Sequence, residues 1–156
     1  MTLDPERDLE ISRIIKAPRM AVWDAWTRPE QFAKWWVPHP EVCRIVSMEV
    51  RPGGGMVTEI APMAGGAFGA HMNACYLDVS EGWRIVFTNA LTGGWRPAEQ
   101  PFITAVITLD DHDLGTAYRA VVMHKSPEDR GMHLEAGFHD GWGTVAAQLA
   151  ALVEGK

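Results

Sequence analysis

The stretch of sequence that decides the fold is residues 16–36, KAPRMAVWDAWTRPEQFAKWW. It follows residues 9–15, whose side chains alternate as they do in a β-strand, and Pro18 near its start suits the first turn of a helix. A second proline, Pro29, interrupts that helix and begins another short one. The stretch therefore predicts a strand that runs directly into a pair of short helices.

Four tryptophans lie within fourteen residues of this stretch, at positions 23, 26, 35 and 36. Each aromatic side chain has roughly 150–250 Å² to bury, so the helix pair must pack against another layer of the protein. We interpret Trp23 and Trp35 as packing residues. Trp26 and Trp36 are in addition candidates for the wall of a cavity.

The rest of the chain reads as six strands in hairpin succession, followed by one long helix. The strands are predicted at about residues 42–50, 56–60, 69–79, 83–89, 102–109 and 116–124, with glycine-rich or aspartate-rich turns between several of them. Ser126 is placed to cap the helix. Its apolar stripe, at steps of four and three, consists of Phe138, Trp142, Val145, Leu149 and Leu152.

The first half of this predicted helix is unusually rich in glycine, at positions 131, 137, 141 and 143. Each glycine costs a helix about 1 kcal/mol relative to alanine. Two arrangements of the helix would compensate for that cost. Either the helix approaches the sheet closely at the glycines, or it leaves room there for a ligand.

Composition restricts the class of protein. With 156 residues, of which 47% are apolar, the chain suits one domain spanning residues 1–156. The net charge is −6 and the 14 Lys and Arg residues are scattered, so we expect no binding to nucleic acid or to anionic membranes. A charged start and the lack of any run of 18 apolar residues predict a cytoplasmic protein. Cys43 and Cys75 are then expected to be reduced, buried packing residues.

The predicted order of elements is that of the α+β helix-grip fold, in which a curved antiparallel sheet of about seven strands wraps around a long C-terminal helix. The chain resembles the START-like (Bet v-like, SRPBCC) superfamily and, within it, the family similar to the activator of heat-shock protein 90 ATPase. The resemblance covers roughly residues 8–153. It rests on Lys16-Ala17-Pro18, residues 22–30, Lys34-Trp35-Trp36, Arg51-Pro52-Gly53-Gly54, residues 83–88, and Gly141-Trp142 with Leu149.

This resemblance implies a pocket between the sheet and the C-terminal helix. The superfamily includes lipid carriers, hormone receptors, polyketide cyclases and co-chaperone domains, so its fold alone does not assign a function. The surplus of tryptophan and methionine favours an apolar lining for that pocket. The candidate ligand-binding residues are Trp26, Trp36, Met48, His71, Met72, Phe87, Tyr118, His124, Met132, Phe138 and Trp142.

The histidines do not have the spacing of a metal site. His133 and His139 are six residues apart and fall on different faces of a helix, and no metal-binding motif accompanies them. His71 and His124 lie on predicted strands, where either is a candidate to face the pocket and titrate near neutral pH. We expect no metal and no cofactor, and no catalytic motif is apparent.

Binding of a small hydrophobic molecule, aromatic or acyl, is therefore the function that the sequence favours, and we expect a binding protein rather than an enzyme. Two alternatives stay open. One is a cyclase or hydrolase acting on a hydrophobic substrate, with His71 or His124 as acid or base. The other is a chaperone-binding module. A homodimer is possible in each case, through a sheet edge or a tryptophan patch.

Overall fold

The computed structural model describes residues 2–155. Seven of its strands form one antiparallel sheet in the order β1-β9-β8-β5-β4-β3-β2, and β6 pairs with β7 in a separate ribbon. The elements are β1 (Asp8–Ile15), α1 (Arg19–Thr27), α2 (Pro29–Phe32), β2 (Val42–Met48), β3 (Gly55–Ala61), β4 (Gly69–Ser80), β5 (Arg84–Thr88), β6 (Leu91–Thr92), β7 (Arg96–Pro97), β8 (Thr104–His112), β9 (Gly115–Met123), α3 (Pro127–Glu135) and α4 (Phe138–Val153).

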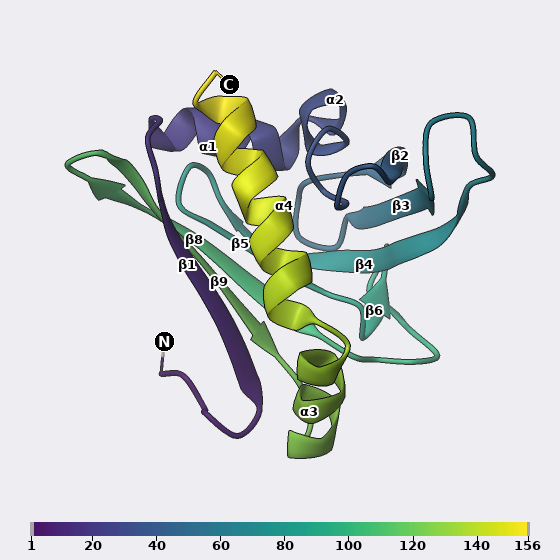
Figure 1. The fold of residues 1–156 in the computed structure, drawn as a ribbon. Helices are drawn as coiled ribbons and strands as arrows, with labels where there is room; N and C mark the ends of the chain where they lie inside the picture. Colours follow the sequence, from purple (N-terminus) through teal and green to yellow (C-terminus); the bar gives the residue numbers. More distant parts are fainter. Residues whose placement is uncertain (1, 156) are drawn as a thin grey trace.

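The large sheet curves around α4, which crosses its concave face (Figure 1). Register shifts interrupt the pairing of β2 with β3, of β3 with β4 and of β4 with β5. Such bulges bend a strand and increase its twist. They fall in the half of the sheet formed by β2 to β5, and the helix-grip arrangement predicted from the sequence is confirmed.

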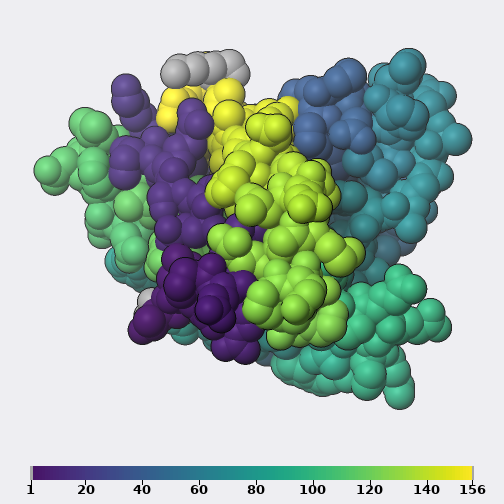
Figure 2. All heavy atoms as spheres, turned by 60° about the horizontal axis from the view of Figure 1, so that its bottom comes forward, coloured from purple at the N-terminus to yellow at the C-terminus, as the bar shows by residue number. Residues whose placement is uncertain are grey.

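The helices cover the concave face from its two ends. Near the C-terminus of α4 lies α1, and α3 lies beyond the N-terminus of α4 (Figure 1). In the space-filling view, the yellow-green surface of the C-terminal helices runs between the purple N-terminal segment and the blue and teal residues that follow α1 (Figure 2). Helix α4 is therefore flanked along its length by both halves of the sheet.

The long C-terminal helix was predicted as one element, and this prediction is wrong. Ser126 does cap a helix, because its Oγ accepts a hydrogen bond from Asp129 N at 3.1 Å. That helix, α3, ends at Glu135. Gly137 then adopts a φ of 96°, in the left-handed region that glycine tolerates best, and the chain starts again as α4.

The loop predicted between β5 and β8 contains the two-residue strands β6 and β7. Trp95, between them, has a φ of 62°, and its ring covers Gly53 so closely that a Cβ added there would lie 2.6 Å from Nε1. The glycine at position 53 is thus required by contact as well as by its own φ of 85°. Strands this short are below the length at which alternation is detectable.

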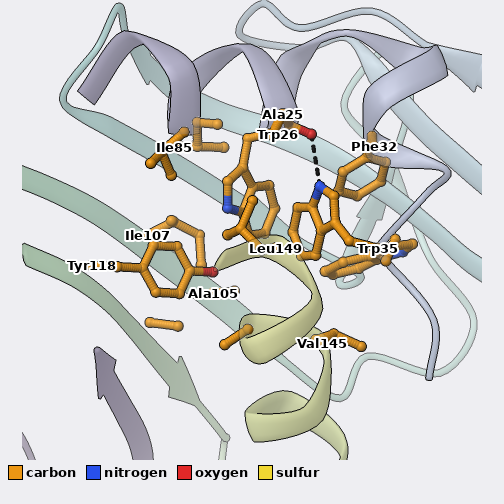
Figure 3. Packing of buried hydrophobic residues seen from close by; sticks show 14 of the residues in the cluster. Ala25, Trp26, Phe32, Trp35, Ile85, Ala105, Ile107, Tyr118, Val145 and Leu149 are labelled. Atoms are coloured by element: carbon orange, nitrogen blue, oxygen red, sulfur yellow. Dashed lines mark hydrogen bonds between the residues drawn. The ribbon is translucent and has the colours of Figure 1, made fainter. Parts of the chain in front are cut away.

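The core lies where α1, α2 and the C-terminal half of α4 meet the sheet (Figure 3). Trp26 and Trp35 are almost fully buried with their ring centroids 4.9 Å apart, and Trp35 Nε1 donates to Ala25 O at 2.9 Å. Trp35 therefore packs in the core, as predicted, and Trp26, a candidate for the cavity wall, packs there as well. Cys75 is buried and Cys43 is half-buried, and both are free thiols.

Within residues 2–155, no helix has both the length and the apolar character that crossing a membrane requires.

Candidate functional site

A cavity of about 370 Å³ lies between the sheet and the N-terminal half of α4. Its walls come from the loop after α2, from β4, from the residues that follow β5 and precede β8, and from α3 and α4. The cavity reaches the surface, since His71 and Ala136 on its rim are exposed. Its volume falls in the range of roughly 300–1,000 Å³ that is usual for small-molecule pockets.

Five of the candidate ligand-binding residues line this cavity: Trp36, His71, Met72, Phe138 and Trp142. Three of them form a continuous aromatic wall. The ring of Trp142 meets Trp36 edge-on with the centroids 5.9 Å apart, and stacks on Phe138 at 5.8 Å. The apolar stripe of the helix thus contributes directly to the cavity at its first three positions, Phe138, Trp142 and Val145.

Three other candidates, Trp26, Phe87 and Tyr118, belong to the core and do not line the cavity. The rings of Trp26 and Phe87 are 6.1 Å apart, with both side chains buried. Burial raises the pKa of the Tyr118 hydroxyl, and contact with the Trp26 indole opposes part of that rise. These three side chains fill the interior of the protein instead of lining the cavity.

The remaining three candidates also lie off the cavity. Met48 is half-buried against the core, whereas Met132 points outward from α3 and is 61% exposed. The sequence predicts Met132 on a single long helix that packs against the sheet. The break at Gly137 turns α3 away, and α3 has no buried residue. His124 lines a second, smaller hollow of about 230 Å³ and contacts a residue of the main cavity, His133.

Sequence reasoning missed nine residues that line the cavity. Most follow or precede a regular element, where position in space depends on how distant strands are brought together. Two of them, Gly137 and Gly141, carried a signal, because glycines in a helix had suggested room for a ligand. The nine are Pro38, Asn89, Phe102, Ile103, His133, Ala136, Gly137, Gly141 and Val145.

The glycines of the C-terminal helices decide between the two explanations offered for them. A Cβ added at Gly131, Gly137, Gly141 or Gly143 would meet nothing within 4 Å. Close approach to the sheet is therefore not what these glycines provide. At Gly137 and Gly141, which line the cavity, the missing side chains leave open volume against α4.

The rim beside Trp36 is tied to α4 by hydrogen bonds. Gln148 Nε2 donates to Trp35 O at 3.1 Å and to Val37 O at 2.8 Å, and its Oε1 accepts from His39 N at 2.8 Å. Opposite, Asn89 Oδ1 accepts from the backbone N–H groups of residues 102 and 103 at 2.8 and 2.9 Å. Both sides of the opening are held by buried or half-buried amide groups.

Two histidines supply polar atoms to an otherwise apolar lining. His71 Nδ1 lies 2.9 Å from Thr58 Oγ1, and partial burial of its ring lowers the pKa of His71. His133 Nδ1 lies 2.8 Å from His124 Nε2. Burial, with a smaller contribution from the nearby His124, lowers the pKa of His133 to about 4. The imidazole of His133 is accordingly neutral at pH 7.

The family described as Activator of Hsp90 ATPase homolog 1-like protein matches residues 16–154. The chain belongs to this AHSA1-like family. That match includes every residue that lines the cavity. It also confirms the resemblance to the START-like, or SRPBCC, superfamily.

Solved structures support the same assignment. A protein from Nitrosomonas europaea is 38% identical, with a TM-score of 0.87 over 97% of both chains. A protein from Chromobacterium violaceum is 25% identical, with a TM-score of 0.72 over 94% of this chain and 97% of that one. An AHSA1-like protein from Aeromonas hydrophila, 16% identical, shares the fold with a TM-score of 0.67, over 95% and 92% of the chains. No curated protein matches this AHSA1-like chain.

Proposed function

We propose that this AHSA1-like protein binds a small hydrophobic molecule, aromatic or acyl, in the cavity between the sheet and α4. The observation that carries the proposal is the open volume at Gly137 and Gly141, in a cavity whose walls also include aromatic rings. Gly141 lies inside α4, where alanine would favour the helix by about 1 kcal/mol, so core packing alone does not account for a glycine that leaves this space open. A ligand gives that space a purpose.

The lining supports an apolar ligand on energetic grounds. Burial of about 200 Å² of ligand surface contributes roughly 5 kcal/mol at about 25 cal/mol per Å², before the entropy of association is subtracted. Trp36 and Trp142 present large aromatic surfaces for this contact.

The test is a protein-observed NMR titration with 2-naphthol, an aromatic probe that the cavity volume accommodates. Signals of Trp36, Met72 and Trp142 are expected to shift on binding. Gly141→Leu fills the cavity from α4 and is expected to weaken binding at least tenfold. Gly143→Leu is the matched control, because Gly143 also has open space around it but does not line the cavity.

The expected result is thus a loss of affinity in Gly141→Leu alone. Equal affinity in the two leucine variants, or shifts confined to residues away from the cavity, would overturn the proposal. The proposal concerns binding and assigns no reaction. Turnover of a hydrophobic ester or polyketide by the protein would favour the enzyme alternative. Capture of a chaperone would favour the alternative of a chaperone-binding module.

A further inference from the structure

We propose that His133 gives the cavity a fixed hydrogen-bond acceptor, so that the preferred ligand carries a hydroxyl group on its apolar body. This inference rests on the proposed binding function and names the class of ligand. It follows from a chain of hydrogen bonds that starts at a backbone carbonyl, passes through His124 and ends at His133.

The first link fixes the proton on His124. Its Nδ1 lies 2.9 Å from the carbonyl oxygen of Arg7, and its backbone N–H donates to the same oxygen at 3.0 Å. A carbonyl oxygen only accepts hydrogen bonds. Nδ1 of His124 must therefore carry a proton, and in the neutral ring Nε2 is left as an acceptor.

The second link fixes the proton on His133. His124 Nε2 and His133 Nδ1 are 2.8 Å apart, so one of the two nitrogens donates to the other. Because Nε2 of neutral His124 accepts, Nδ1 of His133 donates. The remaining nitrogen of His133, Nε2, then has a lone pair and no proton. It lies across the ring from His124, on a residue that lines the cavity.

Aromatic side chains hold both rings in this arrangement. Phe102 meets His124 at 5.4 Å and His133 at 5.2 Å between ring centroids, and Phe138 meets His133 at 5.1 Å. These apolar neighbours disfavour a charged imidazole, in keeping with the lowered pKa of His133. The neutral pair is the form that defines the acceptor.

His71, the other histidine on the cavity, lacks this directionality. Its Nδ1 contacts Thr58 Oγ1, and a hydroxyl group either donates or accepts. Either tautomer of His71 is compatible with that contact. The two histidines therefore differ in their tautomers. The position of the proton on His133 is fixed by the Arg7 carbonyl through two hydrogen bonds, whereas no contact fixes the position of the proton on His71.

The acceptor selects among hydrophobic molecules by their polar group. A phenol, enol or alcohol donates its proton to the Nε2 of His133 and keeps its apolar part against Trp142 and Phe138. An ether or a carboxylate has no proton to donate, and a carboxylate carries in addition the cost of burying a charge in an apolar cavity. A neutral hydroxylated aromatic or aliphatic molecule fits both requirements.

The experiment compares 2-naphthol with 2-methoxynaphthalene, which has the same ring system and no donor, by NMR titration at pH 7.5. In the wild type, 2-naphthol is expected to bind about five- to tenfold more tightly. His133→Leu should remove most of this preference. His71→Leu is the matched control, since it also replaces a histidine on the cavity, and it should retain the preference.

A direct measurement accompanies the variants, because replacing His133 also leaves His124 without its partner. Long-range ¹H–¹⁵N correlation spectra of the wild type distinguish protonated from unprotonated ring nitrogens. They are expected to place protons on Nδ1 of both His124 and His133. A proton on Nε2 of His133 would overturn the inference, as would a preference that survives in His133→Leu.

The outcomes separate the two proposals. If neither naphthalene compound binds to the cavity, the binding function itself fails. If both compounds bind with equal affinity, and Gly141→Leu weakens both, the cavity binds hydrophobic molecules but His133 does not select among them.

Discussion

The two halves of α4 are built for different purposes. From Val145 onward the helix contains no glycine, and Leu149 is fully buried in the core cluster that also contains Trp26 and Tyr118 (Figure 3). Before Val145 the helix carries Gly141 and Gly143, and it borders a cavity of about 370 Å³. One amphipathic helix thus combines a filled half with an open half.

The difference assigns stability of the fold to the filled half of α4 and the proposed ligand binding to the open half. Close packing in the filled half stabilises the fold, because every buried methylene there contacts neighbours. The open half gives up part of that contact and part of the helix propensity. Substitutions in the two halves are therefore expected to have effects of different size, and at some positions of opposite sign.

Leu149→Ala is expected to have the largest effect. Leu149 is fully buried in the filled half, and truncation of such a leucine costs about 2–5 kcal/mol through lost burial and the space left behind. Urea unfolding followed by circular dichroism measures the change. A loss below about 1 kcal/mol would mean that the C-terminal half of α4 is not tightly packed, and the comparison between the halves would break down.

Gly137→Ala comes next. Gly137 joins α3 to α4 with a φ of 96°, and placing a residue with a Cβ in the left-handed region costs about 1–2 kcal/mol. Free space around the position does not relieve this cost, since the strain is in the backbone. The same unfolding experiment is expected to show the loss. Unchanged stability would indicate that the two helices readily join into one.

Acid pH is expected to destabilise the open half through His133. Its pKa is about 4 in the folded protein and about 6.5 in an unfolded chain, so the unfolded state binds a proton at higher pH. Its contribution is complete above about pH 6.5 and is lost as the pH falls towards 4. Allowing for the partial exposure of the ring, we expect a loss of about 1 kcal/mol between pH 7 and pH 5.

His133→Gln isolates this contribution, because glutamine does not titrate and can still donate to His124. Unfolding free energies at pH 7 and pH 5 should differ by about 1 kcal/mol less in the variant than in the wild type. The same difference in both proteins would show that the pH dependence arises elsewhere.

The smallest effects are expected at Gly141 and Gly143, where alanine should stabilise the protein. Both positions have open space around an added Cβ, and alanine favours a helix interior by up to about 1 kcal/mol. Gly141→Ala should at the same time weaken 2-naphthol binding slightly, and Gly143→Ala should not. Thermal unfolding without ligand measures the gain. Destabilisation by Gly141→Ala would mean that the helix is packed more closely there than its open volume indicates.

Local periodicity predicted most of the architecture. The seven strands of the sheet and the helices α1 and α2 were all expected from alternation, from Pro18 and Pro29 and from the glycine turns. The break at Gly137 was not expected, because glycine occurs both inside helices and between them. Its φ depends on how α3 and α4 each meet the sheet, which is a tertiary contact.

The candidate site was harder to predict for the same reason. Trp26 and Trp36 both lie in the tryptophan-rich stretch, yet only Trp36 reaches the cavity. The six-residue spacing between His133 and His139 argued against a metal site and indicated no other role for His133. Its actual partner, His124, is nine residues away across the turn between β9 and α3.

The sequence by itself determined the order of the elements, the apolar stripe of the last helix and the unusual number of glycines in that region, because these depend on neighbours along the chain. Only the tertiary structure decided which apolar residues fill the core, which line the cavity, and that His124 and His133 share a hydrogen bond. The physical reason is that burial and hydrogen bonding act between residues brought together by the curved sheet, and the same residue types serve a filled core and an open cavity equally well.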